Sequence, residues 1–263
     1  MLAPDEPAPV STYNYQGQSS FLLVVDHAGN LIPRALGRLG LTETECKRHI
    51  AWDIGVAGLA RLLAYQLKAN LIEQIYSRLV VDCNRPLDAA TSIANISEDT
   101  VIPGNARVSA QDRKARAREI FEPYHTQIAA ELDRRQGASL PTALISLHSF
   151  TPVFKGVSRP WHAGVLYNRD PRLARLLLAR LNADDDLVVG DNAPYVVDDA
   201  TDYTIPVHGE RRACLMCCSR SAKISSRMRT ASANGQCGWH VCCQKHMKVC
   251  VSGVTIAATV SRH

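Results

Sequence analysis

Short apolar runs alternate with amphipathic stretches over residues 1–212 of the chain. Continuous apolar runs are typical of buried strands, and apolar side chains spaced three or four residues apart are typical of helices. We expect strands over 21–26, 71–75, 78–81, 142–147, 164–167 and 187–189, and helices over 54–67, 109–135 and 171–181. This alternation favours an α/β fold, with a mostly parallel or mixed sheet and helices on both faces.

Two of the predicted strands end in a histidine. His27 follows the run over 21–26, His148 follows the run over 142–147, and Asp53 opens the helix over 54–67. In open α/β sheets, ligands bind outside the carboxyl ends of the strands. Two imidazoles and a carboxylate with an open fourth position form the ligand set of a catalytic zinc ion. The alternative is that the histidines are hydrogen-bonded structural residues and that Asp53 interacts with the helix dipole.

An asparagine and an arginine form a second candidate group. Asn84 and Arg85 follow the predicted strand over 78–81 and precede a proline, so a fixed turn holds both at the same sheet edge. A guanidinium binds a carboxylate through two parallel hydrogen bonds, and an adjacent amide adds another. The pair is therefore a candidate clamp for a substrate acid group. The alternative is a structural arginine paired with Asp82 or Asp88.

Further polar candidates lie outside these groups. The segment His208–Arg212 is dense in polar residues and falls in a predicted loop, and Arg78 and Arg159 are additional cations. Loops of this kind are either solvated or functional.

Charge and cysteine are distributed unevenly. The 263 residues are 46% hydrophobic and 21% charged, which fits one large globular domain or a domain with an appendage. Residues 1–212 hold 23 Lys+Arg against 25 Asp+Glu, whereas the last 51 residues hold seven Lys+Arg, no acid and seven of the nine cysteines. We expect a domain over 1–212, with 1–19 flexible, and an aberrant basic Cys-rich tail over 213–263 that is not an independent domain.

The chain has the composition of a soluble protein. No apolar run reaches the roughly 18 residues that a membrane helix needs. Residues 1–10 contain two acids and three prolines, unlike a signal peptide. We therefore expect a cytoplasmic location and no membrane partner.

Several motifs occur in a fixed order along the chain. They are Val25–Asn30, His49–Gly55, Ser77–Pro86, Ile145–Pro152 and His208–Arg212. Together they resemble the N-formylglutamate amidohydrolase family over about residues 20–212. That family looks like a relative of the zinc carboxypeptidases and aspartoacylases. The resemblance implies a three-layer α/β/α sandwich around a mixed, mostly parallel sheet.

The resemblance also implies an activity and a metal. It implies an enzyme of histidine catabolism that hydrolyses the N-formyl or N-acyl amide of an acidic amino acid, such as N-formylglutamate, by zinc-activated water. His27 and His148 then become the two histidine ligands of the zinc. The relatives take a glutamate three residues after the first histidine, where this chain has Asn30, a poor zinc ligand. Asp53 is the expected substitute.

The resemblance assigns the remaining site residues. An Asn-Arg pair holds the substrate carboxylate in the relatives, and Asn84 and Arg85 are similar to it. The loop over 208–212 is then expected to line the pocket. The other expected residues are Glu210 as a catalytic residue and Arg78, Arg159, His208 and Arg211 as substrate-binding residues.

The chain departs from the family after Arg212. There the family continues with a strand similar to Leu-Pro-His-Val-Leu-Leu-Glu-Ile, whose glutamate resembles the general base of the carboxypeptidases. This chain instead reads Ala-Cys-Leu-Met-Cys-Cys-Ser-Arg from Ala213. Read from the third base of each preceding codon, the tail can encode the family strand by synonymous choice. We infer a one-base frameshift near codon 213, with the glutamate encoded across codons 219 and 220.

Three alternatives remain. The tail could be a zinc-binding module, although it lacks a repeated CxxC frame; its candidate ligands are Cys214, Cys217, Cys242, Cys243, His246 and Cys250. Without the family's glutamate, the gene product could be a catalytically inactive binder of its ligand. A basic Cys-rich nucleic-acid-binding protein would rest on tail charge alone, with no aromatic or helical recognition pattern, so we expect no nucleic-acid partner.

Overall fold

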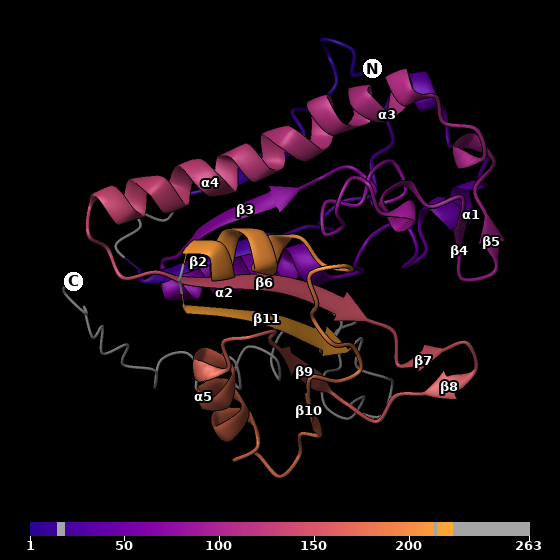
Figure 1. Cartoon of the computed structure of the whole chain (residues 1–263). Helices are drawn as coiled ribbons and strands as arrows, with labels where there is room; N and C mark the ends of the chain where they lie inside the picture. Colours follow the sequence, from indigo (N-terminus) through magenta and orange to yellow (C-terminus); the bar gives the residue numbers. More distant parts are fainter. Residues whose placement is uncertain (15–18, 213–214, 223–263) are drawn as a thin grey trace, which may run out of the picture.

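The computed structural model describes residues 1–14, 19–212 and 215–222, the last of these as backbone only. Seven strands form one twisted mixed sheet (Figure 1). Their spatial order is β1 (Val10–Tyr13), β3 (Asn70–Gln74), β2 (Phe21–Val25), β6 (Ala143–Phe150), β11 (Leu215–Ala222), β9 (Ala163–Leu166) and β10 (Val189–Asp191). The four strands β3, β2, β6 and β11 run parallel, β1 is antiparallel to β3, and β9 is antiparallel to β11 but parallel to β10. The predicted mixed sheet is therefore confirmed.

Helices cover both faces of this sheet. On one face lies a long helical run made of α3 (Ala110–Arg116), a π-helical turn (Ala117–Phe121) and α4 (Glu122–Gly137). On the other face lie α2 (Val56–Leu67) and α5 (Arg172–Leu181). Figure 1 shows the α3–α4 run along one side of the sheet and α5 on the opposite side. The chain is thus a three-layer α/β/α sandwich, as predicted.

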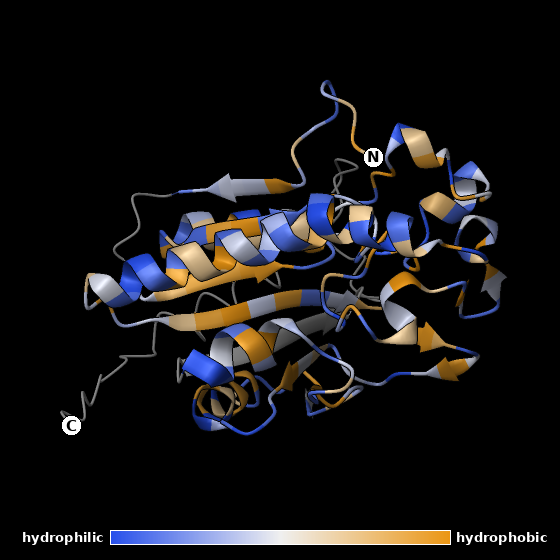
Figure 2. Cartoon of the chain, turned by 45° about the horizontal axis from the view of Figure 1, so that its top comes forward, coloured by the Kyte–Doolittle hydropathy of each residue, from blue (hydrophilic) through white to orange (hydrophobic). Residues whose placement is uncertain are grey.

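The core follows the two-residue period of the strands. In β2, Leu22 and Val24 pack with α4, whereas Leu23 and Val25 pack with α2 and α5. All four side chains are fully buried, which is why the segment contains no polar alternation. Figure 2 shows the central strands as largely hydrophobic and α4 as mixed, in keeping with one buried and one exposed helix face.

Two predicted elements differ from the structure. The segment over 78–81 is a turn and not a strand, since the Val80 N–H donates to the Ser77 carbonyl at 2.9 Å. Its apolar side chains are buried, and burial alone does not distinguish a strand from a buried turn. The segment over 208–212, predicted as a loop, lies in a π-helical turn (Ile205–Gly209) and a 3-10 turn (Glu210–Arg212).

The smaller elements lie outside the sheet. They are helix α1 (Glu43–Cys46), the hairpin of β4 (Ile96–Ser97) and β5 (Thr100–Val101), the hairpin of β7 (Val153–Phe154) and β8 (Val157–Ser158), and 3-10 turns at Arg34–Leu36, Ala90–Ile93 and Pro103–Asn105. Within the described part of the chain, no helix is long and apolar enough to cross a membrane.

The sheet extends beyond the segment boundaries expected from the sequence. Residues 1–19 were expected to be flexible, but they include β1, which pairs with β3. β11 lies beyond Arg212, the expected end of the domain, yet it pairs with β6 and β9 in the middle of the sheet. The pattern of apolar residues predicts neither strand, because β1 is an edge strand and β11 has few aliphatic residues. The rest of the Cys-rich tail, including the candidate zinc ligands from Cys242 onward, lies outside the described residues.

Candidate metal centre

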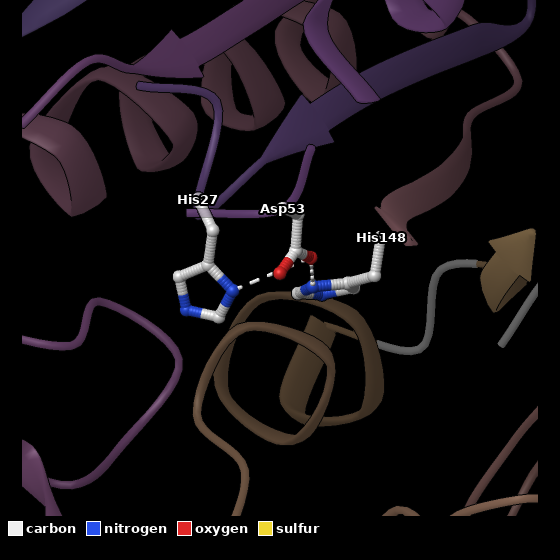
Figure 3. Close-up of side chains that lie close together, drawn as sticks. All are labelled: His27, Asp53 and His148. Carbon is white, nitrogen blue, oxygen red and sulfur yellow. Dashed lines mark hydrogen bonds and ion pairs between the residues drawn. The ribbon is translucent and has the colours of Figure 1, made fainter. Parts of the chain in front are cut away.

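The structure brings His27, Asp53 and His148 together at the carboxyl ends of β2 and β6. One potential ligand atom from each residue lies within 4.8 Å of the others, and all three side chains are buried. Figure 3 shows the Asp53 carboxylate between the two imidazoles. His148 lies inside β6, near its end, and not after the strand as predicted. Within the described residues this is the one group of three or more His, Cys, Asp or Glu side chains that could hold a metal ion.

Two glycines shape the backbone that carries this cluster. Gly29 passes so close to β3 that a Cβ atom there would lie 2.0 Å from the Ile75 carbonyl oxygen. Gly55 has a φ of 84°, which lets the chain turn from Asp53 into α2. The Asp53 N–H donates to the His27 carbonyl at 3.0 Å, so the two loops are joined directly.

Each imidazole turns its Nδ1 toward Asp53 and its Nε2 toward another buried carboxylate. Nδ1 of His148 lies 2.9 Å from an Asp53 oxygen, and Nδ1 of His27 lies 3.5 Å from the same oxygen. Nε2 of His27 donates to Asp82 at 2.7 Å, and Nε2 of His148 lies 3.1 Å from Asp26. Because carboxylates accept only, both nitrogens of each ring face an acceptor. A cation beside Asp53 would take the lone pair of each Nδ1 and leave the ring proton on Nε2.

This donor set fits a divalent metal ion. Metal-binding histidines usually donate their second ring N–H to a carboxylate, which fixes the tautomer and orients the ring. Nδ1 of His27 is buried without a hydrogen-bond partner, which is costly unless it has another function. Asn30, the alternative third ligand, instead donates to the Cys46 carbonyl at 3.0 Å.

Charge compensation holds the surrounding carboxylates in their ionised form. Burial alone would raise the pKa of Asp53, but the charges and hydrogen bonds of His27 and His148 hold that pKa well below its usual range. Burial opposes ionisation of Asp82 as well, and the neighbouring Arg78 and His27 lower its pKa. Asp26, Asp53 and Asp82 thus place three carboxylates around the two imidazoles, which is an electrostatic environment that favours a cation.

Of the three cluster residues, Asp53 lines a pocket of about 380 Å³. Asp53, Asp82, Arg78 and Arg85 line one part of it, and residues of the β4–β5 hairpin line another part. This volume lies in the range of small-molecule sites.

Two of the arginines predicted for the site lie in this pocket. Arg78 donates to Asp82 at 2.6 Å and lies 3.7 Å from Asp53, so it is tied to the cluster. Arg85 lies 3.7 Å from Asp202 and keeps part of its guanidinium exposed to the pocket.

Asn84 does not line the pocket, because its side chain is bound elsewhere. Its amide donates to Asp202 at 2.8 Å, and its oxygen accepts from the N–H groups of Tyr203 and Thr204 at 3.1 Å. Asn84 therefore joins the turn after residue 81 to the segment over 202–204, and it positions Arg85.

The other predicted site residues are not among those that line this pocket. Arg159 stacks on Phe154 and Tyr195, two residues of the pocket wall, and donates to the Tyr195 hydroxyl at 2.8 Å. His208 is buried against His125, 2.9 Å away.

The Glu210 carboxylate accepts from the Arg169 N–H at 2.7 Å, and it also pairs with the Arg169 guanidinium. Arg211 is exposed. Glu210, predicted as catalytic, thus binds Arg169 and is not among the residues that line the pocket.

Sequence analysis missed the outer carboxylates and one further pair. Asp26 and Asp82 were visible at the ends of apolar runs, but their hydrogen bonds to histidines depend on tertiary contacts. His49 and Glu98 both line the pocket, and Nε2 of His49 lies 2.9 Å from a Glu98 oxygen. His49 stands four residues before Asp53, which was the available signal.

Fold and site together define an α/β/α protein with a candidate three-ligand metal centre at the carboxyl edge of its sheet. The chain belongs to the N-formylglutamate amidohydrolase family, whose model matches residues 19–217.

Curated relatives agree with this membership. The chain is 30% identical over 186 residues to an N-formylglutamate deformylase of Pseudomonas aeruginosa, and 30% identical over 179 residues to one of Pseudomonas putida. These alignments span 64% and 62% of the chain and 66% of each relative, just under two thirds of their length.

Among solved structures, a gene product of Agrobacterium tumefaciens matches with a TM-score of 0.81 and 33% identity, over 84% of this chain and 87% of that one. An N-formylglutamate amidohydrolase of Ralstonia eutropha shares the fold, with a TM-score of 0.59 and 14% identity over 82% of this chain and 86% of that one.

Proposed function

We propose that the chain is a metal-dependent amidohydrolase that removes the formyl group from an N-formylated acidic amino acid such as N-formylglutamate. One observation carries the proposal. Both cluster histidines turn Nδ1 toward Asp53 and hold Nε2 against a second buried carboxylate. This arrangement costs free energy without a cation and orients two ligands with one. The family relatives, which are named N-formylglutamate deformylases, supply the substrate class.

His27, Asp53 and His148 would hold the metal, with zinc as the expected ion. Such an ion polarises an amide carbonyl and acidifies water. The pocket residues supply the rest of the chemistry. Arg85 lines the pocket and binds a substrate carboxylate through its guanidinium. Arg78 donates to Asp82 and keeps that carboxylate ionised, so that Asp82 accepts the hydrogen bond from His27.

The frameshift near codon 213 forms a second part of the proposal. With one base inserted before codon 214, synonymous codon choices for the tail can encode the family strand, and the family's glutamate then falls at position 220. In the backbone register of β11 and β6, position 220 pairs with His148. A glutamate restored there stands beside a cluster residue and could take a proton from water.

A non-catalytic binding protein is the second candidate function, and the present sequence of β11 favours it. That strand carries no glutamate at residues 215–222, and loss of a general base lowers turnover by about 100- to 10,000-fold. A cytoplasmic location and a role in histidine catabolism are further parts of the proposal. They rest on the composition and on the family.

Formate release tests the proposal. Purified protein, stripped of metal and then given zinc, is incubated with N-formylglutamate, alongside a variant carrying the one-base insertion. We expect zinc-dependent formate release from both and faster release from the corrected chain. Ligand binding without formate release by either chain would establish the non-catalytic alternative.

A further inference from the structure

The pocket contains an imidazole–carboxylate pair that the metal cluster does not use. Nε2 of His49 lies 2.9 Å from a Glu98 oxygen, and both residues line the same pocket as Asp53. The His49 side chain is 34% exposed and that of Glu98 is 16% exposed, so the imidazole can be reached while the carboxylate behind it is largely covered.

Glu98 adopts a backbone conformation that glutamate rarely takes. The register of β4 and β5 pairs Ser97 with Thr100, so Glu98 and Asp99 form a two-residue hairpin turn. Glu98 has a φ of 53°, a region in which such turns favour glycine, asparagine or aspartate. Contacts of its side chain must offset this strain, because a strained residue persists only where its surroundings hold it.

Two side chains hold the Glu98 carboxylate. His49 contacts one oxygen, and Arg48 donates to the other at 3.2 Å while also donating to Thr100 of the same hairpin at 2.7 Å. Since a carboxylate only accepts, Nε2 of neutral His49 carries the proton and Nδ1 carries the lone pair. An imidazole held by a carboxylate in this way has the arrangement of a general base with its orienting group.

The other titratable groups that line the described pocket either have other partners or are poor proton acceptors. Asp53 belongs to the cluster, and Asp82 is bound to His27 and Arg78. An arginine side chain has no hydrogen-bond acceptor, and the Tyr195 hydroxyl already accepts a hydrogen bond from Arg159 at 2.8 Å.

We propose that His49, oriented by Glu98, is the proton-transfer residue of the hydrolysis carried out by this chain. As the oxygen of water forms a bond to the formyl carbon, one O–H bond breaks and its proton passes to Nδ1 of His49. The imidazolium, stabilised by Glu98, then gives this proton to the amide nitrogen as the C–N bond breaks, which releases formate and the free amino acid. His49 is a catalytic residue in this account, and Glu98 is a positioning residue. The inference rests on the proposed deformylase function.

Steady-state formate release by the full zinc-loaded chain tests it, with N-formylglutamate as substrate. We expect H49A to lower kcat by about 100-fold or more with little change in KM, and added imidazole to restore part of the lost rate. E98Q should lower kcat less than H49A, and in ¹⁵N NMR spectra it should convert the Nε2–H tautomer of His49 into a mixture. The half-buried His162, which lies outside the pocket lining, supplies the matched control H162A, which should leave kcat unchanged.

Zinc content separates a damaged site from a missing base, because H49A should keep the zinc of the unaltered chain. An unchanged kcat in H49A, or a change in KM alone, would overturn the proposal. So would an inactive chain whose frame-corrected form is active. If neither form releases formate, the deformylase function itself is wrong.

Discussion

Asp82 accepts a hydrogen bond from Nε2 of His27 at 2.7 Å and so fixes the ring whose Nδ1 faces Asp53. Asp26 stands in the same relation to His148, and it also accepts from Thr204 at 2.6 Å and from Tyr124 at 3.0 Å. The two histidines are therefore oriented by residues that do not belong to the three-residue cluster.

Asp82→Asn should weaken zinc binding by about 10- to 100-fold, because an amide can present an N–H to the ring and favours the wrong tautomer. Competition with a chromophoric chelator measures the affinity. The exposed Asp185 supplies a matched control, since Asp185→Asn makes the same chemical change far from the pocket lining. Equal affinities of D82N and D185N would show that Asp82 does not tune the centre.

Arg85→Lys should raise KM for N-formylglutamate by about 10-fold and change KM much less for an analogue whose α-carboxylate is capped as an amide. A lysine keeps the charge but loses the two-pronged contact with a carboxylate. The comparison of the two substrates is the measurement. Arg211→Lys is the control, because Arg211 is exposed and lies outside the pocket lining. Identical effects of R85K on both substrates would place the carboxylate elsewhere.

The pair of His125 and His208 should make the fold sensitive to acid. Burial lowers the pKa of His125 to about 4, and burial together with the nearby His125 and Arg212 lowers that of His208 to about 3. Nε2 of His125 donates to the Cys83 carbonyl, so its Nδ1 accepts from His208 and both rings must be neutral in the folded state.

The contribution of these two neutral histidines to the free energy of unfolding should therefore be fully present above about pH 6.5 and should fall as the pH drops toward 4. The reason is that both histidines take up a proton at a higher pH in the unfolded chain than in the folded chain. The loss is on the order of 1 kcal/mol per pH unit. Urea unfolding with saturating zinc at about pH 7 and about pH 5 measures it. His208→Asn should reduce this pH dependence, whereas a variant with the slope of the unaltered chain would contradict the role of the pair.

The one-base insertion before codon 214 should raise turnover by about 100-fold or more, provided that the restored glutamate takes part in proton transfer. It should also raise the soluble yield, since the corrected strand replaces cysteine and serine by aliphatic residues in the middle of the sheet. Parallel expression of both reading frames measures the two effects. If the uncorrected chain proves equally soluble and equally active, the frameshift is wrong.

The sequence predicts the layers of this fold well and its contacts less well. The apolar run that forms β2 is continuous because both of its faces are buried, so its pattern is unambiguous. The segment over 78–81 is also rich in apolar residues but lies in a turn, because a buried turn needs apolar side chains as much as a buried strand does.

The site was predicted where strand ends determine it, as for His27 and His148. It was not predictable where partners are distant in the chain. Glu210 binds Arg169, 41 residues away, and Asn84 binds Asp202, 118 residues away. Residue type and local order gave no sign that these side chains turn away from the pocket.

Metal content tests the central claim most directly. Elemental analysis of the dialysed protein should find one zinc ion per chain, and H27A and H148A should each lose it, because a three-ligand site without one imidazole cannot keep its geometry. Asp53→Ala should lose it as well, whereas Asn30→Ala should retain it, since the Asn30 side chain binds the Cys46 carbonyl. Undiminished zinc in either histidine variant, with the fold intact by circular dichroism, would contradict the metal centre and with it the proposed hydrolase.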